Sequence, residues 1–346
     1  MKIAFIINQF ETEEAGYDTT LLSYAAAKKG HEVYTMQVED LCYYSDGHIG
    51  GLARKAPSKI TSISTYFAAI KDPSRTTKIT SEEIDVFFLR NNPCEEIGDR
   101  SWAQTTGMIF GQVATSKDVL VVNDPYTLLS SFNKMYFQHF PEAVRPRTII
   151  SRNPDEIEKF YKSEKKKIIL KPLQGSGGKD VFLLDSSTNL NQIVETISRY
   201  GFIIAQEYLP EASKGDIRVL MLNGKILEVK GKAAAMRRVN KKGDIRSNIH
   251  TGGSAAKFEM TDKVRELCAL VAPKLIRDGM FLVGVDIVGD KIMELNLESP
   301  GGLVSMEKLE KAQFANQVID AIEKKVYFKQ QYGNRLPNAF ISSLDV

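Results

Sequence analysis

Residues 282–297 of the chain read LVGVDIVGDKIMELNL. Two apolar runs, Leu282–Val288 and Ile292–Leu297, stand on either side of Gly289-Asp290. A glycine-containing pair between two apolar runs predicts a tight β-hairpin, because such turns need residues that tolerate positive φ angles. We therefore expect an antiparallel strand pair near the C-terminal end of the chain.

A second hairpin is predicted earlier in the same half. Arg218–Leu222 and Lys225–Val229 flank Asn223-Gly224, and asparagine–glycine is the strongest short-range hairpin signal. A helix predicted from about Thr261 to Ile276 separates the two hairpins. This half of the chain is thus expected to be α+β, with antiparallel strands.

Three side chains of the first hairpin carry oxygen donors: Asp286, Glu294 and Asn296. Glu294 and Asn296 are two residues apart on one strand and therefore share a face. Asp286 joins that face only if the turn has an odd number of residues, such as Gly289–Lys291. The alternative is an ordinary solvated strand face. Facing carboxylates repel unless a cation lies between them, so we favour a site for Mg²⁺ or, alternatively, Mn²⁺.

A glycine-rich segment, Gln174–Gly178, follows the apolar run Ile168–Pro172. Its residues Gly175, Ser176, Gly177 and Gly178 could turn backbone amides toward an anion, although a flexible turn is equally consistent with them. It is not a Walker A loop, because Lys179 is followed by Asp180. Lys171 favours phosphate binding, since a lysine in a buried strand needs a charged or wet partner. Lys134 is a weaker candidate of the same kind.

The stretch Lys232–Gly253 is basic, punctuated by glycine and without apolar periodicity. Arg238, Arg246 and Asn248 lie in it. One interpretation is a lid that brings arginines onto phosphates and carboxylates, and an ordinary solvated loop is another. A nucleic-acid patch is disfavoured because no aromatic residues alternate with the charges.

The N-terminal half predicts an alternating α/β unit. Ile3–Ile7 is a buried strand, Asp18 is the expected N-cap of a helix that ends at Gly30, and His31–Met36 is the next strand. Further strands are expected at 85–90 and 119–123, before a break at Asn123-Asp124-Pro125. This order is that of a doubly wound, Rossmann-like sheet.

The composition narrows the class of protein. A chain of 346 residues suggests two or three domains. The net charge of +3 does not indicate a nucleic-acid partner. Three widely spaced cysteines favour neither a disulfide framework nor zinc. No window reaches the roughly 20 apolar residues that span a bilayer, so we expect no membrane partner and a cytoplasmic location.

Taken in order, these segments resemble the ATP-grasp superfamily and most closely the prokaryotic glutathione synthetase family. The residues that carry the resemblance are Ile168–Leu173 with the glycine loop, Ala205–Pro210, Gly215–Leu220, Arg246–Asn248 with Gly252-Gly253, Val283–Asp290 and Glu294–Asn296. The resemblance covers most of the chain, from Met1 to about Lys325. The chain departs from the family's pattern at Glu298, where a small hydroxyl residue is usual, and at Gly301-Gly302.

The resemblance implies roles for particular residues. Lys134, Lys171 and the amides of Gly175–Gly178 would contact the phosphates of ATP. Glu207, Tyr208 and Leu209 would form the adenine-binding hinge, with Asp216 at the ribose. Asp286, Glu294 and Asn296 would bind magnesium. The residues implied at the acyl phosphate or peptide substrate are Arg218, Arg238, Arg246 and Asn248.

The implied organisation is an ATP-grasp fold after a Rossmann-like pre-ATP-grasp domain. We expect the first domain at 1–123, a central subdomain at 124–205, a C-terminal subdomain at 206–330 with a lid at about 234–253, and a tail at 331–346. The implied activity is ATP- and magnesium-dependent joining of γ-glutamylcysteine and glycine through an acyl phosphate. Two alternatives are a related ligase with other amino-acid or peptide substrates and a non-catalytic ATP-binding regulatory protein. A homo-oligomer is expected from the family alone.

Overall fold

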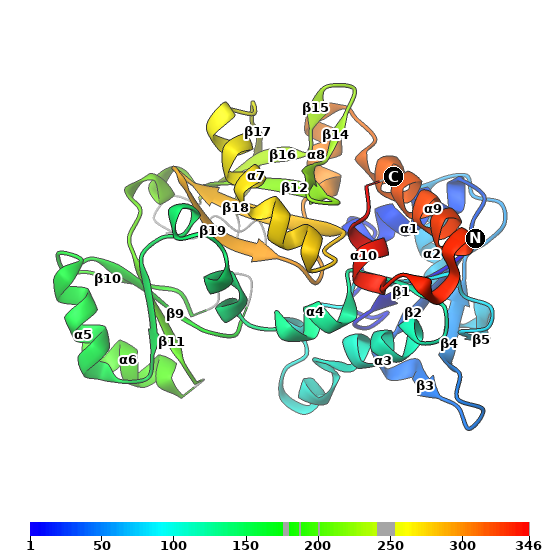
Figure 1. Cartoon of the computed structure of the whole chain (residues 1–346), viewed down its shortest axis with the longest axis horizontal. Helices are drawn as coiled ribbons and strands as arrows, with labels where there is room; N and C mark the ends of the chain where they lie inside the picture. The colour runs from blue at the N-terminus through cyan, green and yellow to red at the C-terminus, as the bar shows by residue number, and fades with distance from the viewer. Residues whose placement is uncertain (176–179, 187, 200, 241–252, 346) are drawn as a thin grey trace.

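A computed structural model describes residues 1–175, 180–186, 188–199, 201–240 and 253–345. Within these residues the strands form three larger sheets and one two-stranded ribbon. Figure 1 shows the second sheet and its helices as a separate lobe at the left, and the first sheet at the right. The third sheet lies between them, so it is placed to contact both.

The first sheet has seven strands in the order β3-β4-β2-β1-β6-β7, with β5 paired to β4. The central strands are parallel: β1 pairs with β2 and β6, and β6 pairs with β7. The strands are β1 (Lys2–Ile7), β2 (Glu32–Gln37), β3 (Leu41–Tyr43), β4 (Ile49–Lys55), β5 (Thr76–Thr80), β6 (Val86–Leu89) and β7 (Leu120–Val122), and the helices are α1 (Asp18–Lys28), α2 (Ile63–Lys71) and α3 (Thr106–Thr115). The predicted doubly wound core is present, extended by an antiparallel edge.

The expected N-cap role of Asp18 is wrong. Tyr17 occupies that position of α1, and Asp18 is the first residue of the helix. The Asp18 carboxylate instead accepts hydrogen bonds from the backbone N–H groups of Leu303 and Val304, at 2.7 and 2.9 Å. These residues begin α8 (Leu303–Glu310). Asp18 therefore satisfies the N-terminal donors of a distant helix, a contact that local sequence could not indicate.

The second sheet is antiparallel, in the order β10-β9-β11-β8. Its elements are β8 (Thr148–Ser151), α5 (Pro154–Ser163), β9 (Ile168–Pro172), β10 (Phe182–Leu184), α6 (Leu190–Ser198) and β11 (Ile203–Glu207). It has a separate core in which Ile157 of α5 and Ile197 of α6 pack on Leu170 and Ala205. Because β11 continues through Glu207, we propose placing the boundary after that residue rather than after 205.

The third sheet has the order β17-β16-β12-β18-β19, with β13 paired to β12. Its strands are β12 (Asp216–Leu222), β13 (Lys225–Ile226), β16 (Ala235–Val239), β17 (Ser254–Lys257), β18 (Leu282–Val288) and β19 (Lys291–Asn296), and the separate ribbon is β14 (Glu228–Val229) with β15 (Lys232–Ala233). Helix α7 (Asp262–Arg277) covers its apolar face, where Val264 and Val271 join the core of Val219 and Val285. The first part of the expected lid is thus strand β16, because Met236 and Arg238 pair with β12.

The hairpin of β18 and β19 has a two-residue turn, since Val288 pairs with Lys291. The expectation of an odd-length turn is therefore wrong. A β-bulge in β19 has the same effect on side-chain direction as an odd-length turn. Ile287 pairs with Ile292 but Asp286 pairs with Glu294, so Met293 is the extra residue. One inserted residue reverses the facing of every side chain beyond it. Asp286 and Glu294 consequently lie directly opposite each other.

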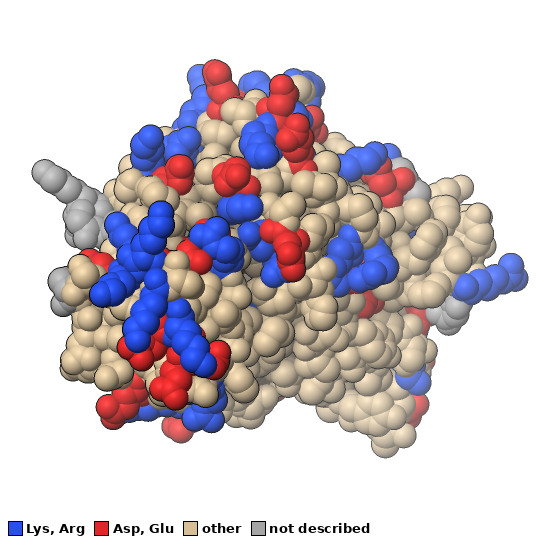
Figure 2. Space-filling view, turned by 60° about the vertical axis from the view of Figure 1, so that its left-hand side comes forward, with Lys and Arg blue, Asp and Glu red and all other residues tan. Residues whose placement is uncertain are grey.

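The first and third sheets share their cores, whereas the second does not. Phe5 of β1 belongs to one apolar cluster with Leu220 of β12 and Ile319 of α9 (Phe314–Tyr332). The connecting helix α4 (Pro125–Ser130) and the final helix α10 (Asn338–Ser343) lie at this junction. No described helix is long and apolar enough to cross a membrane. Acidic and basic side chains are interspersed over much of the face in Figure 2.

Candidate active site

One face of the third sheet carries a row of charged side chains on four adjacent strands. Arg238 of β16 is paired with Asp216 of β12, and Arg218 of β12 with Asp286 of β18. Glu294 of β19 completes the row opposite Asp286. Directly opposed residues in neighbouring strands share a face of the sheet. Period-two alternation therefore puts the charges on one side and the apolar core under α7 on the other.

Asp286 is the most highly coordinated carboxylate of this row. Arg218 donates to it through both Nε and Nη2, the latter at 2.7 Å, and Arg238 Nη2 lies 2.8 Å from Oδ2. Asn296 Nδ2 also donates to Oδ2, at 3.2 Å. Burial alone would raise the pKa of Asp286, but the charges of Arg218 and Arg238 outweigh it and hold the pKa well below its usual range. The carboxylate is thus held ionised and fixed in orientation.

Arg238 also connects Asp216 to this network. Its Nε and Nη2 each donate to the Asp216 carboxylate at 2.7 Å. Asp216, Arg218, Arg238 and Asp286 are all buried. A buried network of this kind is stable only because each charge is paired and hydrogen-bonded.

Glu294 and Asn296 face a cleft between the second and third sheets. The Glu294 carboxylate has 36% of its side-chain area exposed and lies 3.8 Å from Lys134 Nζ. Carboxylate and amide oxygens without histidine or cysteine are the donor set of hard cations such as Mg²⁺. Within the described residues no group of three or more His, Cys, Asp or Glu forms a complete metal cage. Glu294 and the amide oxygen of Asn296 therefore fit a magnesium ion whose other ligands come from phosphates or water. Both oxygens of Asp286 already accept hydrogen bonds from Arg218, so this carboxylate could bind the ion only in exchange for those contacts.

Two lysines also line the cleft. Lys171 of β9 donates to Gln206 Oε1 of β11 at 3.2 Å, and Lys134 Nζ donates to the carbonyl oxygen of Gly175. Burial lowers the pKa of Lys171 to about 8, although Glu294 opposes the shift. An anion placed between these lysines would remove much of that burial cost.

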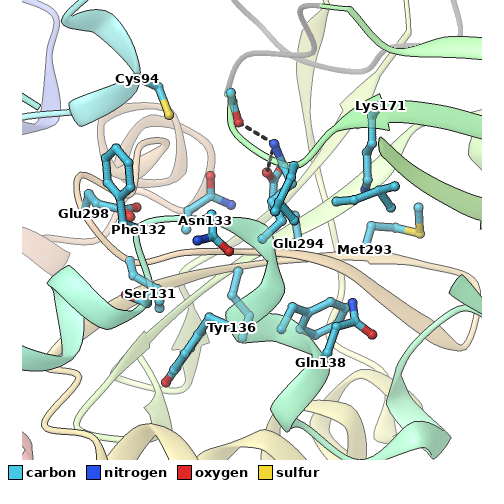
Figure 3. A pocket seen from close by; sticks show the side chains of 18 of the residues that line it. Cys94, Ser131, Phe132, Asn133, Tyr136, Gln138, Lys171, Met293, Glu294 and Glu298 are labelled. Atoms are coloured by element: carbon cyan, nitrogen blue, oxygen red, sulfur yellow. Dashed lines mark hydrogen bonds and ion pairs between the residues drawn. The ribbon is translucent and has the colours of Figure 1, made fainter. Parts of the chain in front are cut away.

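The cleft is open to solvent, and the empty space in it and at its mouth is about 880 Å³. Figure 3 shows Lys171 and Met293 toward one end of it and Glu298 with Phe132 toward the other. Burial and the nearby Glu294 raise the pKa of Glu298 to about 7, against hydrogen bonds from its own backbone and that of Leu297.

The structure brings together most of the residues singled out from the sequence. Lys134, Lys171, Gly175, Glu294 and Asn296 line the cleft. Asp216, Arg218, Arg238 and Asp286 form the buried network beside it. The remaining predicted positions Ser176, Gly177, Gly178, Arg246 and Asn248 lie outside the described residues.

The residues predicted to form the adenine-binding hinge, Glu207, Tyr208 and Leu209, do not line the cleft. Glu207 lies opposite Ile168, on the face of the second sheet that α5 and α6 cover. Its carboxylate accepts hydrogen bonds from the backbone N–H of Arg147 at 2.7 Å and lies 2.6 Å from Arg147 Nη2. Tyr208 packs against Lys167, with Nζ 4.1 Å from the ring centre. Since these three residues are not among those that line the cleft, their contact with adenine stays a prediction.

Sequence reasoning missed Gln206 and Asn123. Gln206 shares a face with Lys171, because Ile204 pairs with Lys171 and lies two residues earlier in β11. Side chains alternate between the two faces of a strand, so this shared face could have been predicted once the pairing of the two strands was known. Asn123 bonds the backbone of both β18 and the residue after β19. No local pattern predicts such a long-range contact.

The chain matches two family models over most of its length. Residues 1–128 match the N-terminal domain of prokaryotic glutathione synthetase, and residues 133–311 match its ATP-grasp domain. A glutathione synthetase from Gloeobacter violaceus is 31% identical, with 92% of this chain and 96% of the relative covered. One from Synechococcus elongatus is 32% identical, with 94% and 99% covered.

Solved structures show the same fold at lower identity. D-cycloserine synthetase DcsG is 13% identical with a TM-score of 0.63, covering 94% of this chain and 99% of its own. The ATP-grasp ligase PsnB, in a complex with minimal precursor, Mg and ADP, is 16% identical with a TM-score of 0.56, covering 94% and 98%. The expected α/β ATP-grasp architecture is confirmed. The chain belongs to the prokaryotic glutathione synthetase family and is an ATP-dependent ligase similar to glutathione synthetase.

Proposed function

We propose that this ligase joins γ-glutamylcysteine to glycine with ATP and Mg²⁺. The observation that supports it best is the composition of the cleft. Lys134 Nζ lies 3.8 Å from the Glu294 carboxylate, and Lys171 and Asn296 line the same cleft. Cations and hard oxygen donors in one cleft suit a nucleotide triphosphate with its metal. The family relatives named glutathione synthetase support the choice of substrates.

The proposed reaction has two steps. The substrate carboxylate attacks the γ-phosphorus of ATP, the bond to the β-phosphate oxygen breaks, and an acyl phosphate and ADP result. The amine then attacks the acyl carbon, phosphate leaves, and an amide forms with loss of a proton. Neither step needs a protein nucleophile, so the contribution of the site is positioning and charge stabilisation.

Each group of side chains has a role in this proposal. Lys134 and Lys171 bind phosphate oxygens, and Arg218 and Arg238 hold Asp286 in place. Bound Mg²⁺ would neutralise phosphate charge beside Glu294 and Asn296. Ribose contact by Asp216, adenine contact by residues 207–209, and substrate binding by Arg246 and Asn248 remain predictions. A cytoplasmic location and a homo-oligomeric state also remain predictions.

A second candidate function is an ATP-grasp ligase for a different acid and amine. The carboxylate of Glu298 in the cleft favours it, because a charge at the substrate end changes which substrates fit. A regulatory ATP-binding protein without turnover is the other alternative.

One assay separates these functions. Purified protein with magnesium and ATP receives γ-glutamylcysteine and glycine, and then a panel of other amino acids and dipeptides, while ADP release and peptide product are measured. Turnover on the first pair supports the proposal. Turnover only on other pairs supports the second candidate, and tight ATP binding without any turnover overturns both.

A further inference from the structure

The side chain of Glu298 is a carboxylate in the cleft that the proposed phosphate and metal contacts do not use. It lies two residues beyond Asn296 and lines the cleft with Phe132 and Asn133. Among the described residues no Lys, Arg or His forms an ion pair with it within 4.0 Å. The charged groups near it are Glu294, which repels it, and Lys134, which attracts it.

The backbone around Glu298 is held on both sides by four polar side chains, two from loops and two from α1 and β12. Asn123 Nδ2 donates to the carbonyl of Leu297 at 2.6 Å. On the other side, Arg90 Nη2 donates to the carbonyl of Pro300 at 3.2 Å, and Arg218 Nη1 donates to the carbonyl of Gly301 at 2.9 Å. The Asp18 carboxylate accepts a hydrogen bond from the N–H of Leu303 at 2.7 Å. A segment fixed in this way cannot easily turn its side chain out to water. The location of Glu298 is therefore built into the fold.

The charges give the cleft two different ends. Lys134 and Lys171 make one end suitable for phosphates. At the other end, Glu298 and Phe132 both line the cleft, and a negative charge and a ring face each attract an organic cation. The Glu298 carboxylate accepts hydrogen bonds from its own backbone and that of Leu297 but has no cationic partner within 4.0 Å among the described residues. A negative charge in a partly desolvated site is costly, and a bound cation lowers that cost. An aliphatic amine is mainly an ammonium ion at neutral pH.

We propose that Glu298, together with the ring of Phe132, binds the ammonium group of the incoming amine substrate and so determines which amines the ligase accepts. This rests on the proposed ligase function, because the nitrogen held by Glu298 is the one that attacks the acyl carbon after it loses a proton. Lys134 and Glu294 both act electrostatically on Glu298, so this position is beside the proposed phosphate and metal contacts. Glu298 thus acts as a specificity-determining residue in amine binding. Phosphate and metal binding are assigned to other side chains.

The test compares Glu298→Gln with wild type, and Asp290→Asn serves as the matched control. Asp290 loses the same charge in the same hairpin but is exposed in the turn. We expect Glu298→Gln to raise the KM for glycine at least about tenfold, as loss of a charge-assisted bond does. The KM for ATP and the magnesium concentration for half-maximal rate should change by less than about twofold. Asp290→Asn should leave all three unchanged.

Equilibrium binding provides a readout that does not depend on turnover. ¹³C-labelled glycine is titrated by NMR into protein loaded with magnesium and a non-hydrolysable ATP analogue, and glycolate is the control because a hydroxyl replaces its ammonium. Glu298→Gln should weaken glycine at least about tenfold and leave glycolate unchanged. Equal or tighter glycine binding in the variant overturns the proposal, as does a shifted magnesium requirement, which would make Glu298 a metal ligand. Weakened glycine binding without any ligase turnover in wild type would reject the proposed function and not the ammonium site.

Discussion

Asn123 makes the clearest prediction about how the two halves of the molecule are held together. Its side chain is 4% exposed. Nδ2 donates to the carbonyls of Leu282 at 2.9 Å and Leu297 at 2.6 Å, and Oδ1 accepts from the N–H groups of Phe281 at 2.7 Å and Leu282 at 2.8 Å. One amide from the first domain therefore satisfies four backbone groups of the third sheet.

The expected cost of Asn123→Ala follows from these four bonds. Each buried hydrogen bond contributes about 1 kcal/mol net, and an unsatisfied backbone group costs about 1–3 kcal/mol. Four bonds give a loss of about 4 kcal/mol in the free energy of unfolding, reduced if water enters the site. This is a large part of the roughly 5–15 kcal/mol by which proteins are stable. Asn123→Asp should also destabilise, because one carboxylate oxygen would face the carbonyls of Leu282 and Leu297.

Urea unfolding followed by circular dichroism measures the effect. A loss of about 4 kcal/mol corresponds to a fall of roughly 1 M in the midpoint for a chain of this size. Asn153→Ala is the matched control, because Asn153 is exposed and its side chain makes one capping bond, to the N–H of Asp155 at 2.9 Å. That control should lose only about 1 kcal/mol. If Asn123→Ala loses no more than Asn153→Ala, the bridging role of Asn123 is refuted.

Three further predictions concern the cleft. Glu294→Gln should reduce magnesium-dependent turnover at least about 100-fold with an unchanged unfolding midpoint, and unchanged activity would contradict the metal assignment. Burial lowers the pKa of Lys171 from 10.5 to about 8, so the KM for ATP should rise as the pH increases above about 8. In the unfolded state Lys171 keeps its proton up to about pH 10.5, whereas in the folded state it loses the proton above about pH 8. The free energy of unfolding should therefore rise between pH 8 and 10.5. Urea titrations of Lys171→Met should show no such rise from this residue. Arg218→Lys keeps the positive charge but loses the bidentate hydrogen bonds to Asp286 and the bond to the Gly301 carbonyl. We expect kcat to fall at least about tenfold. If the variant has the kcat of wild type, the positive charge alone is sufficient.

Local chemistry in the sequence predicts much of the fold. The strand predicted at Ile3–Ile7 is observed as Lys2–Ile7, and the helix predicted from about Thr261 to Ile276 is observed as Asp262–Arg277. The turns at Asn223-Gly224 and Gly289-Asp290 are also present, as the turn residues predict. The antiparallel extension of the first sheet was not predicted. Its strands at 41–55 and 76–80 have weak patterns, and pairing with each other and with β2 stabilises them.

For the proposed site, residue type and spacing along single strands pointed to Lys134, Lys171 and the carboxylates of the last hairpin. The role of Arg218 was implied by the family resemblance, and these assignments remain predictions. The tertiary structure decided how they meet. Met293 in a bulge, not the turn length, turned Asp286 toward Glu294, and Asp18 reached a distant helix instead of its own. Such outcomes depend on the free energy of contacts between segments far apart in the chain, and no local pattern contains that information.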